Sequence, residues 1–274
     1  MEKTTRKLSA PAAERKRLDR VLVERGLVET REKAQALILA GNVIVEGRKI
    51  EKAGTPVNLS CAVEILPPKS RYVGRGGLKL EAALAELGWD VRSLVCLDIG
   101  SSTGGFVDCL LQHGAARVIA VDVGTSQLDW RLRQDPRVRL LERTNARYLA
   151  WEQIGEKADL ITMDVSFISA TRILPALPQF AKPGARLLVL VKPQFEVGKG
   201  QVGKGGIVRD AALQQQSVAH VRECAASLGF ADLHTFPCPI LGAEGNQEFF
   251  LAATYSERNN SADAKRARSA DTEE

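Results

Sequence analysis

Short apolar runs alternate with amphipathic segments from residue 94 to residue 255. The predicted strands are 94–99, 118–123, 138–142, 160–164, 187–191, 233–237 and 248–255. Helices are predicted after Gly104 and over 126–133, 170–180 and 211–228. Strands that are apolar along their whole length are buried on both faces, as in a parallel sheet covered by helices. The pattern therefore predicts an α/β domain that binds its ligands at the carboxyl ends of the strands.

The N-terminal part of the chain follows a different pattern. Apolar positions at helical spacing predict one helix over 18–25 and a second from an N-cap at Thr30 to a stop at Gly41. The period then changes to two over 43–45 and 48–50, which predicts a β-hairpin. We therefore expect a small α+β module in front of the α/β domain.

Charge separates the two regions. The chain has 274 residues and a net charge of +5. Residues 1–80 carry 17 Lys+Arg and 9 Asp+Glu, a balance of +8, which leaves −3 for the rest. A basic module on a mildly acidic body favours an anionic partner, most often a nucleic acid. Charge alone leaves a merely solvated basic surface equally open.

A spaced motif within the basic module favours RNA as that partner. Residues 17–47 read R-L-D-x-x-L-x-x-x-G and then R-x-x-A-x-x-L-I-x-x-G-x-V-x-V-x-G. This pattern resembles the S4 RNA-binding domain of ribosomal proteins, pseudouridine synthases and tyrosyl-tRNA synthetases. The resemblance implies that a basic helix face and the hairpin contact RNA phosphates. The residues assigned to these contacts are Arg17, Arg20, Arg31, Lys33, Arg48 and Lys49.

These patterns give an order of domains. We expect a disordered start, an S4-like module, a linker containing Pro67-Pro68, the α/β domain and a disordered tail. Their boundaries are 1–16, 17–66, 67–78, 79–255 and 256–274.

Composition bounds the cellular setting. The five cysteines form no CxxC pair, which predicts reduced, buried thiols, and we expect no bound metal. No apolar stretch approaches the roughly 20 residues of a membrane span, and the N-terminus lacks an apolar signal region. We expect a cytoplasmic monomer without a membrane partner.

A cluster of small residues follows the first strand of the α/β domain, in "CLDIGSSTGGF". Its glycines do not fit the dinucleotide motif G-x-G-x-x-G, and Phe106 stands where a phosphate loop needs lysine. The D-x-G-x-x-x-G-G turn instead resembles motif I of S-adenosylmethionine-dependent methyltransferases, which implies a Rossmann-like sheet. The candidate cofactor residues are Asp98, Gly100, Ser101, Ser102, Gly104, Gly105 and Phe106, with Asp122 after the next strand as an acceptor for ribose hydroxyls.

Charged residues near the strand ends indicate which atom is methylated. The segment "MDVSF" lacks the prolines and stacked aromatic of aminomethyltransferases, and Cys238 lies too late in the chain for a cytosine C5 nucleophile. The candidate catalytic set is Lys79, at the start of a predicted helix, with Asp164, Lys192 and Glu248. A lysine held by a carboxylate suits activation of a ribose 2′-hydroxyl. Taken singly, each residue is equally explained as a surface charge or a salt bridge.

At greater length the chain resembles the TlyA family over residues 17–255. The segments that carry this resemblance are "VGRGGLKLEAAL", "LDIGSSTGGFVDCLL", "VIAVDVGTSQLDWRLR", "ERTNARYL", "DLITMDVSFIS", "LVKPQFEVGKG" and "GNQEFFL". It implies an FtsJ-type domain, S-adenosylmethionine, and a cytidine ribose in the rRNA of the large, and in some members the small, ribosomal subunit. It places the tetrad on the same four charged residues and adds Asn145 and Asp164 to the cofactor site. Residues 71–73 resemble the family's interdomain motif, with Tyr72 where tryptophan is usual.

Three alternatives remain open at this level. One is a 2′-O-methyltransferase that acts on tRNA. The second is a membrane-damaging protein, as the name hemolysin given to some members of the family suggests. The third is a ribosome-binding protein whose methyltransferase fold no longer catalyses.

Overall fold

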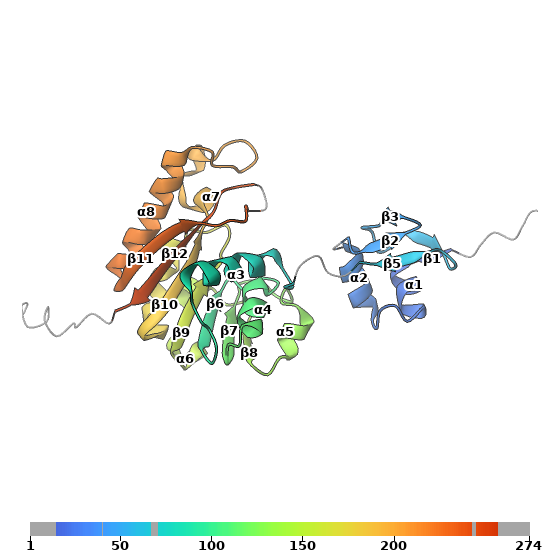
Figure 1. The fold of residues 1–274 in the computed structure, drawn as a ribbon, viewed down its shortest axis with the longest axis horizontal. Helices are drawn as coiled ribbons and strands as arrows, with labels where there is room; N and C mark the ends of the chain where they lie inside the picture. Colours follow the sequence, from blue (N-terminus) through green and yellow to red (C-terminus); the bar gives the residue numbers. More distant parts are fainter. Residues whose placement is uncertain (1–14, 40, 67–70, 243–244, 257–274) are drawn as a thin grey trace, which may run out of the picture. The chain divides into compact units, whose positions relative to one another are not determined.

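The computed structural model describes residues 15–39, 41–66, 71–242 and 245–256 (Figure 1). The chain divides into two compact units, unit 1 (Met1–Lys69) and unit 2 (Ser70–Glu274). The predicted disordered segments 1–16 and 256–274 fall almost entirely outside the described residues, and the Pro67-Pro68 boundary does so completely.

Unit 1 is a small α+β module. Its elements are β1 (Arg15–Arg17), α1 (Leu18–Glu24), α2 (Arg31–Leu39), β2 (Val43–Val45), β3 (Arg48–Lys49), β4 (Pro56–Asn58) and β5 (Val63–Ile65). Strand β1 pairs with β4, and β2 lies between β3 and β5. The apolar faces of α1 and α2 are buried in one core, which includes Leu18, Leu22 and Ile38. The two helices and the hairpin expected from the sequence are confirmed.

A buried carboxylate organises the surface of unit 1. Asp19 has no exposed surface, yet it accepts hydrogen bonds from Arg17 at 2.9 and 3.0 Å, from Arg31 at 2.9 Å and from Gln35 at 2.9 Å. The guanidinium of Arg17 is the leading cause of the low pKa of Asp19, which lies well below its usual range. Both arginine side chains remain about half exposed.

Replacing Asp19 with asparagine is expected to destabilise unit 1 by about 1.5–3 kcal/mol, because charge-assisted hydrogen bonds are lost. A carboxyl whose pKa is lowered by folding contributes stability above its unfolded pKa and loses it as the pH falls through the folded value. Wild-type unit 1 should therefore begin to lose this stability below about pH 4, whereas Asp19→Asn should not. Urea denaturation of a fragment of residues 1–69 at pH 7 and pH 3 measures both effects. Equal pH dependence in the two proteins would contradict the assignment.

Unit 2 is built on a seven-stranded sheet with the order β11-β12-β10-β9-β6-β7-β8. The strands are β6 (Val95–Ile99), β7 (Arg117–Val121), β8 (Val138–Leu141), β9 (Ala158–Met163), β10 (Ala181–Val191), β11 (Phe230–Pro237) and β12 (Phe249–Tyr255). The first five are parallel, and β12 runs antiparallel to both β10 and β11. All seven strands expected from the sequence are confirmed, within a few residues at each end for most of them.

The helices and 3₁₀ turns of unit 2 connect these strands. They are α3 (Arg75–Leu87), α4 (Gly105–Gln112), α5 (Trp130–Gln134), η1 (Ala146–Tyr148), α6 (Trp151–Ile154), η2 (Ala170–Arg172), η3 (Leu174–Ala176), η4 (Pro178–Phe180), α7 (Pro193–Glu196), η5 (Lys199–Gln201) and α8 (Ala211–Ser227). The chain goes from β6 to β7 on one side and returns to β9 on the other. The carboxyl ends of β6 and β9 therefore form the switch point of the sheet, where ligands bind in such folds.

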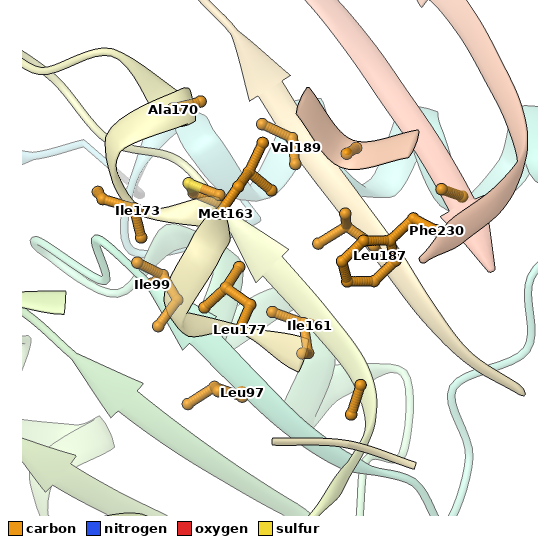
Figure 2. Packing of buried hydrophobic residues seen from close by; sticks show 14 of the residues in the cluster. Leu97, Ile99, Ile161, Met163, Ala170, Ile173, Leu177, Leu187, Val189 and Phe230 are labelled. Atoms are coloured by element: carbon orange, nitrogen blue, oxygen red, sulfur yellow. The ribbon is translucent and has the colours of Figure 1, made fainter. Parts of the chain in front are cut away.

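Side chains alternate between two apolar cores, one on each face of the sheet. Leu97, Ile99, Ile161 and Met163 point to the face that also receives Phe230 at the start of β11 (Figure 2). Helices α3 and α4 cover the opposite face (Figure 1). Burial on both faces explains why the strands are apolar throughout.

Two helix predictions were wrong in extent. The segment 170–180 forms η2, η3 and η4 in succession instead of one helix. Pro175 and Pro178 lie in the first turns of η3 and η4, and proline has no backbone N–H to continue an α-helix. Of the predicted helix 126–133, only the short α5 forms. Its N-cap is Asp129, whose side chain accepts a hydrogen bond from the Arg131 backbone nitrogen.

The helix expected to begin at Lys79 begins four residues earlier, at Arg75. Gly76 and Gly77 occupy its first turn, and glycine is a poor helix former. The packing requires them: a Cβ at Gly77 would clash with the Tyr72 side chain, and one at Gly105 would lie 2.9 Å from the Gly77 nitrogen. The helix begins earlier than predicted because α3 packs closely against the glycine turn. Lys79 therefore lies in the second turn of α3.

Candidate active site

The glycine turn after β6 is held against the end of β9. Gly100 has φ +83°, and a Cβ on it would lie 2.5 Å from the carbonyl oxygen of Asp164. Gly104 has φ +98° and leads directly into α4. Only glycine adopts these conformations without strain or clash. The turn therefore brings backbone rather than side chains to the switch point of the sheet.

Polar groups line this turn. The Asp122 carboxylate, after β7, accepts hydrogen bonds from the backbone nitrogens of Ser102 and Gly124, both at 2.7 Å. The buried hydroxyl of Ser101 has no hydrogen-bond partner among the described residues. Asn145 is exposed and caps η1 by accepting from the Arg147 backbone at 3.1 Å. Asp122 and Ser101 thus lie together at the turn and retain unused hydrogen-bonding capacity.

Asp98 occupies a different position from the other predicted cofactor residues. It has no exposed surface, and one of its oxygens accepts a hydrogen bond from Thr162 at 2.6 Å. Burial raises the pKa of Asp98 to about 7. A molecule at the surface would not contact this carboxyl in the present conformation, so its contact with a cofactor stays a prediction.

Lys79 and Glu248 form a buried ion pair. The Lys79 ammonium donates to Glu248 at 2.5 Å, and their side chains are only 9% and 3% exposed. Removing two charges from water is costly, and apolar side chains of similar size often stabilise a protein as well or better. The pair is therefore weak evidence for a stabilising role and better evidence for a chemical one.

Lys192 and Asp164 form a second pair, with side chains that are 11% and 22% exposed. Their charged atoms lie 2.6 Å apart, although not in the orientation of a directed hydrogen bond. The directed hydrogen bond from the Lys192 ammonium goes to the Ser166 hydroxyl at 2.9 Å. Two groups that follow β9 therefore hold the lysine that follows β10.

The register of the sheet brings the two pairs to one edge. Val191 lies opposite Phe249, so Lys192 and Glu248 flank the last paired position of β10 and β12. The first turn of α3 lies against β9, since a Cβ on Gly76 would be 3.6 Å from an Asp164 carboxylate oxygen. All four residues of the predicted catalytic set thus lie at the carboxyl edge of the parallel strands.

Other chemistries find less support at this edge. Cys238 is buried, and burial raises the pKa of its thiol, which is unfavourable for a nucleophile. Within the described ranges, no group of three or more His, Cys, Asp and Glu side chains is arranged to hold a metal ion. The described residues also contain no helix that is long and apolar enough to cross a membrane.

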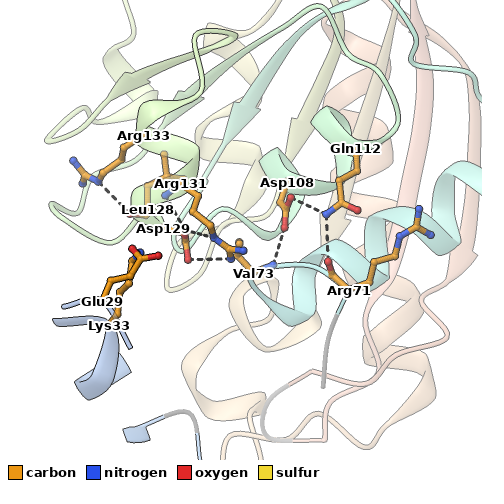
Figure 3. A network of polar contacts seen from close by, with 10 residues as sticks. All are labelled: Glu29, Lys33, Arg71, Val73, Asp108, Gln112, Leu128, Asp129, Arg131 and Arg133. Carbon is orange, nitrogen blue, oxygen red and sulfur yellow. Dashed lines mark hydrogen bonds and ion pairs between the residues drawn. The ribbon is translucent and has the colours of Figure 1, made fainter. Parts of the chain in front are cut away.

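The segment 71–73, which resembles an interdomain motif, is bound to unit 2. Asp108 and Gln112 of α4 bond to the Val73 nitrogen at 2.8 Å and the Arg71 carbonyl at 3.2 Å (Figure 3). Tyr72 is 3% exposed and packs within the core under α3. Tyrosine in place of tryptophan therefore serves as a core residue of unit 2 in this structure.

Sequence reasoning missed Ser166 and an aromatic residue beside it. Phe167 follows Ser166, is 91% exposed and has φ +66°, which is uncommon for a bulky residue. Its ring contacts that of Phe195 with 5.2 Å between centroids. The segment "MDVSF" ends in this aromatic, so the expectation that it lacks an exposed aromatic is wrong, and only the prolines of aminomethyltransferases are missing from it.

The basic residues predicted to bind RNA lie on the surface of unit 1. Arg20, Arg48 and Lys49 are exposed. Lys33 is 25% exposed and forms an ion pair with Glu29. Arg17 and Arg31 each use one edge of the guanidinium on Asp19 and keep about half of the side chain exposed. These positions are compatible with phosphate contacts, and the contacts themselves stay a prediction.

Comparisons with known proteins agree with this arrangement. A family model for FtsJ-like methyltransferases matches residues 72–255, and one for the S4 domain matches residues 16–60. The fold and the site therefore define a methyltransferase of the S-adenosylmethionine-dependent type joined to an S4 domain.

Individual relatives narrow the family. The 16S/23S rRNA (cytidine-2'-O)-methyltransferase TlyA of Mycobacterium tuberculosis is 48% identical over 240 residues, covering 87% of this chain and 90% of that protein. Hemolysin A of Brachyspira hyodysenteriae is 41% identical over 234 residues, or 85% of this chain and 97% of that protein. A solved structure from Streptococcus thermophilus shares 41% identity and a TM-score of 0.68, over 90% of both chains. The chain belongs to the TlyA family of FtsJ-like methyltransferases.

Proposed function

We propose that this protein transfers a methyl group from S-adenosylmethionine to the ribose 2′-oxygen of a cytidine in ribosomal RNA. The observation that carries the proposal is the placement of two lysine–carboxylate pairs at the carboxyl edge of a methyltransferase sheet. The relatives named as cytidine-2'-O-methyltransferases support the choice of nucleotide and of RNA.

The chemistry follows from the four side chains. Lys192 would deprotonate or orient the 2′-hydroxyl, while Asp164 and Ser166 hold its ammonium. The buried pair of Lys79 and Glu248 would hold the ribose. Bound S-adenosylmethionine supplies the electrophilic methyl group.

The turn after β6 fits such a cofactor. Backbone at Gly100 and Gly104 allows close approach, the unpartnered hydroxyl of Ser101 offers a hydrogen bond, and Asp122 can accept from ribose hydroxyls. Asn145 and Asp164 would complete the site from the ends of β8 and β9. Asp98 lies buried below the turn, and its contact with the cofactor stays a prediction.

Replacing Asp122 with alanine is expected to weaken S-adenosylmethionine binding by about 1–3 kcal/mol, because a charged acceptor is lost. Isothermal titration calorimetry measures the change. Asp210→Ala is a matched control: Asp210 also accepts two backbone N–H groups, from Ala212 and Leu213, but caps α8. Unchanged affinity in Asp122→Ala, or an equal loss in the control, would reject the assignment.

Phe167 extends the site toward the RNA. Bases in single-stranded RNA are commonly held by stacking on exposed aromatic side chains. Phe167 presents such a face one residue from Ser166, the hydrogen-bond partner of Lys192. We propose that the target base is unstacked from its neighbours and rests there.

The decisive experiment incubates the full-length protein with labelled S-adenosylmethionine and, separately, small ribosomal subunits, large ribosomal subunits and tRNA. Methylation of a cytidine 2′-oxygen in either subunit is expected, and nuclease mapping locates the nucleotide. Methylation of tRNA alone would establish the tRNA enzyme instead. Cofactor binding without turnover on any of the three RNAs would indicate a ribosome-binding protein.

A further inference from the structure

The segments that follow β9 and β10 are joined side by side beyond the end of the sheet. The first connection is made by Lys192, which forms an ion pair with Asp164 and donates a hydrogen bond to Ser166. The second is the ring contact of Phe195 with Phe167. Parallel strands normally lose their connection where backbone hydrogen bonding stops, so these contacts extend the pairing by side chains alone.

Glu196 makes the third and outermost joint. One of its oxygens accepts from the Ser169 hydroxyl at 2.5 Å, and the other accepts from the Ala170 backbone nitrogen at 2.8 Å. Glu196 ends the short helix α7, whose N-cap is Lys192, and the Phe195 nitrogen donates to the Lys192 carbonyl at 2.9 Å. The carboxylate is therefore fixed to the backbone that carries the lysine.

The environment of Glu196 argues against an incidental surface contact. Burial raises the pKa of this carboxyl, so its charge is kept there at a cost in solvation. The two groups that it binds begin η2, directly after the turn that carries Ser166 and Phe167. The Glu196 side chain thus connects α7, which begins after Lys192, to the segment after β9 that carries Asp164 and Ser166.

We propose that Glu196 is a positioning residue for the methyl-transfer site: by joining the two segments, it holds Lys192 in register with Asp164 and Ser166. This inference rests on the proposed role of Lys192. Glu196 lies at the opposite end of α7 from the lysine, and its hydrogen bonds go to Ser169 and Ala170 rather than to the lysine pair. Its effect is exerted through the backbone of α7.

The geometry predicts different outcomes for two substitutions. Glu196→Ala removes both acceptors and frees the two segments. Glu196→Gln can keep the joint, because its amide oxygen accepts from Ala170 and its amide nitrogen donates to the Ser169 hydroxyl. Displacement of a reacting group by about 1 Å costs up to about 100-fold in rate. We therefore expect kcat to fall between about tenfold and 100-fold in Glu196→Ala and to recover to within about threefold of wild type in Glu196→Gln.

The experiment measures kcat and KM on whichever RNA the wild-type protein methylates, together with cofactor affinity and melting temperature. A positioning role lowers kcat in Glu196→Ala and leaves KM and cofactor affinity nearly unchanged. In a Lys192→Ala background the same substitution should cause no further loss. The matched control is Glu223→Ala, an exposed glutamate on α8, which should leave all four quantities unchanged.

Three results would overturn the inference while the proposed function stands: an unchanged kcat in Glu196→Ala, a Glu196→Gln protein as slow as the alanine variant, or a full additional loss in the Lys192→Ala background. A drop in melting temperature accompanied by equal losses in cofactor affinity and kcat would assign Glu196 to folding instead. A wild-type protein that methylates none of the RNAs would reject the proposed function, and the role of Glu196 with it.

Discussion

Replacing Lys192 with alanine is expected to lower kcat by about 10²–10⁴-fold, while binding of cofactor and RNA changes little. The ammonium is the group that both Asp164 and Ser166 hold, and it lies at the carboxyl edge of the parallel strands. Without it, the ribose hydroxyl loses the group that takes or orients its proton. Single-turnover methylation, with RNA and cofactor affinities measured separately, tests this expectation.

The sheet offers a matched control for that substitution. Lys182 lies within β10, near its start, and forms an ion pair with Asp159 near the start of β9 at 2.7 Å. Lys182→Ala therefore removes the same kind of pair from the same two strands at the opposite edge. It should retain near wild-type turnover. If the Lys192→Ala enzyme is as active as this control, the charged set (Lys79, Asp164, Lys192 and Glu248) forms structural salt bridges and is not catalytic.

Removal of unit 1 is expected to abolish methylation of ribosomal subunits and to leave cofactor binding largely intact. Unit 2 has its own sheet and its own two cores, so a chain that begins at residue 70 should still fold. The exposed basic side chains of unit 1 would be absent from it. The measurements are methyl incorporation into purified subunits and calorimetric titration of S-adenosylmethionine.

Salt dependence separates phosphate binding from other roles of unit 1. RNA affinity should fall steeply with added salt, since binding to phosphates releases counterions. Substituting Arg48 and Lys49 together with glutamine should reduce the slope by about two, one for each cation that no longer neutralises a phosphate. Arg222→Gln, an exposed position on α8, serves as the control. A salt-insensitive complex, or a fully active truncated chain, would show that the basic surface does not bind the RNA.

The strands were predictable because burial on both faces requires apolar residues at every position, and this requirement does not depend on the segments that connect the strands. The charged set was predictable for a related reason. A lysine such as Lys192 directly after a fully buried run must emerge at the edge of the sheet. The structure confirms that Asp164 and Glu248 reach the same edge. Strand β10 pairs in parallel with β9, which ends just before Asp164, and antiparallel with β12, which begins just after Glu248.

Features set by packing between distant segments were not predictable in this way. The start of α3 was placed too late because Gly76 and Gly77 are required by the packing of Tyr72 and the glycine turn, not by helix propensity. The 3₁₀ turns over 170–180 were missed for a local reason, since Pro175 lies in the first turn of η3 and Pro178 in that of η4. Phe167 became visible only through its positive φ, and Glu196 only through its two bonds across to η2.

The insertion of β12 between β10 and β11 has a consequence for the order of folding. Glu248 meets Lys79 across 169 residues of sequence, and it is delivered by the final strand of the sheet. A chain emerging from synthesis can assemble β6 to β10 early, but Lys79 then lacks its counter-ion and β10 has an open edge. Pairings of such long sequence separation form late and slowly. The enzyme should therefore gain stability and catalytic competence together, in one last step when β12 is inserted.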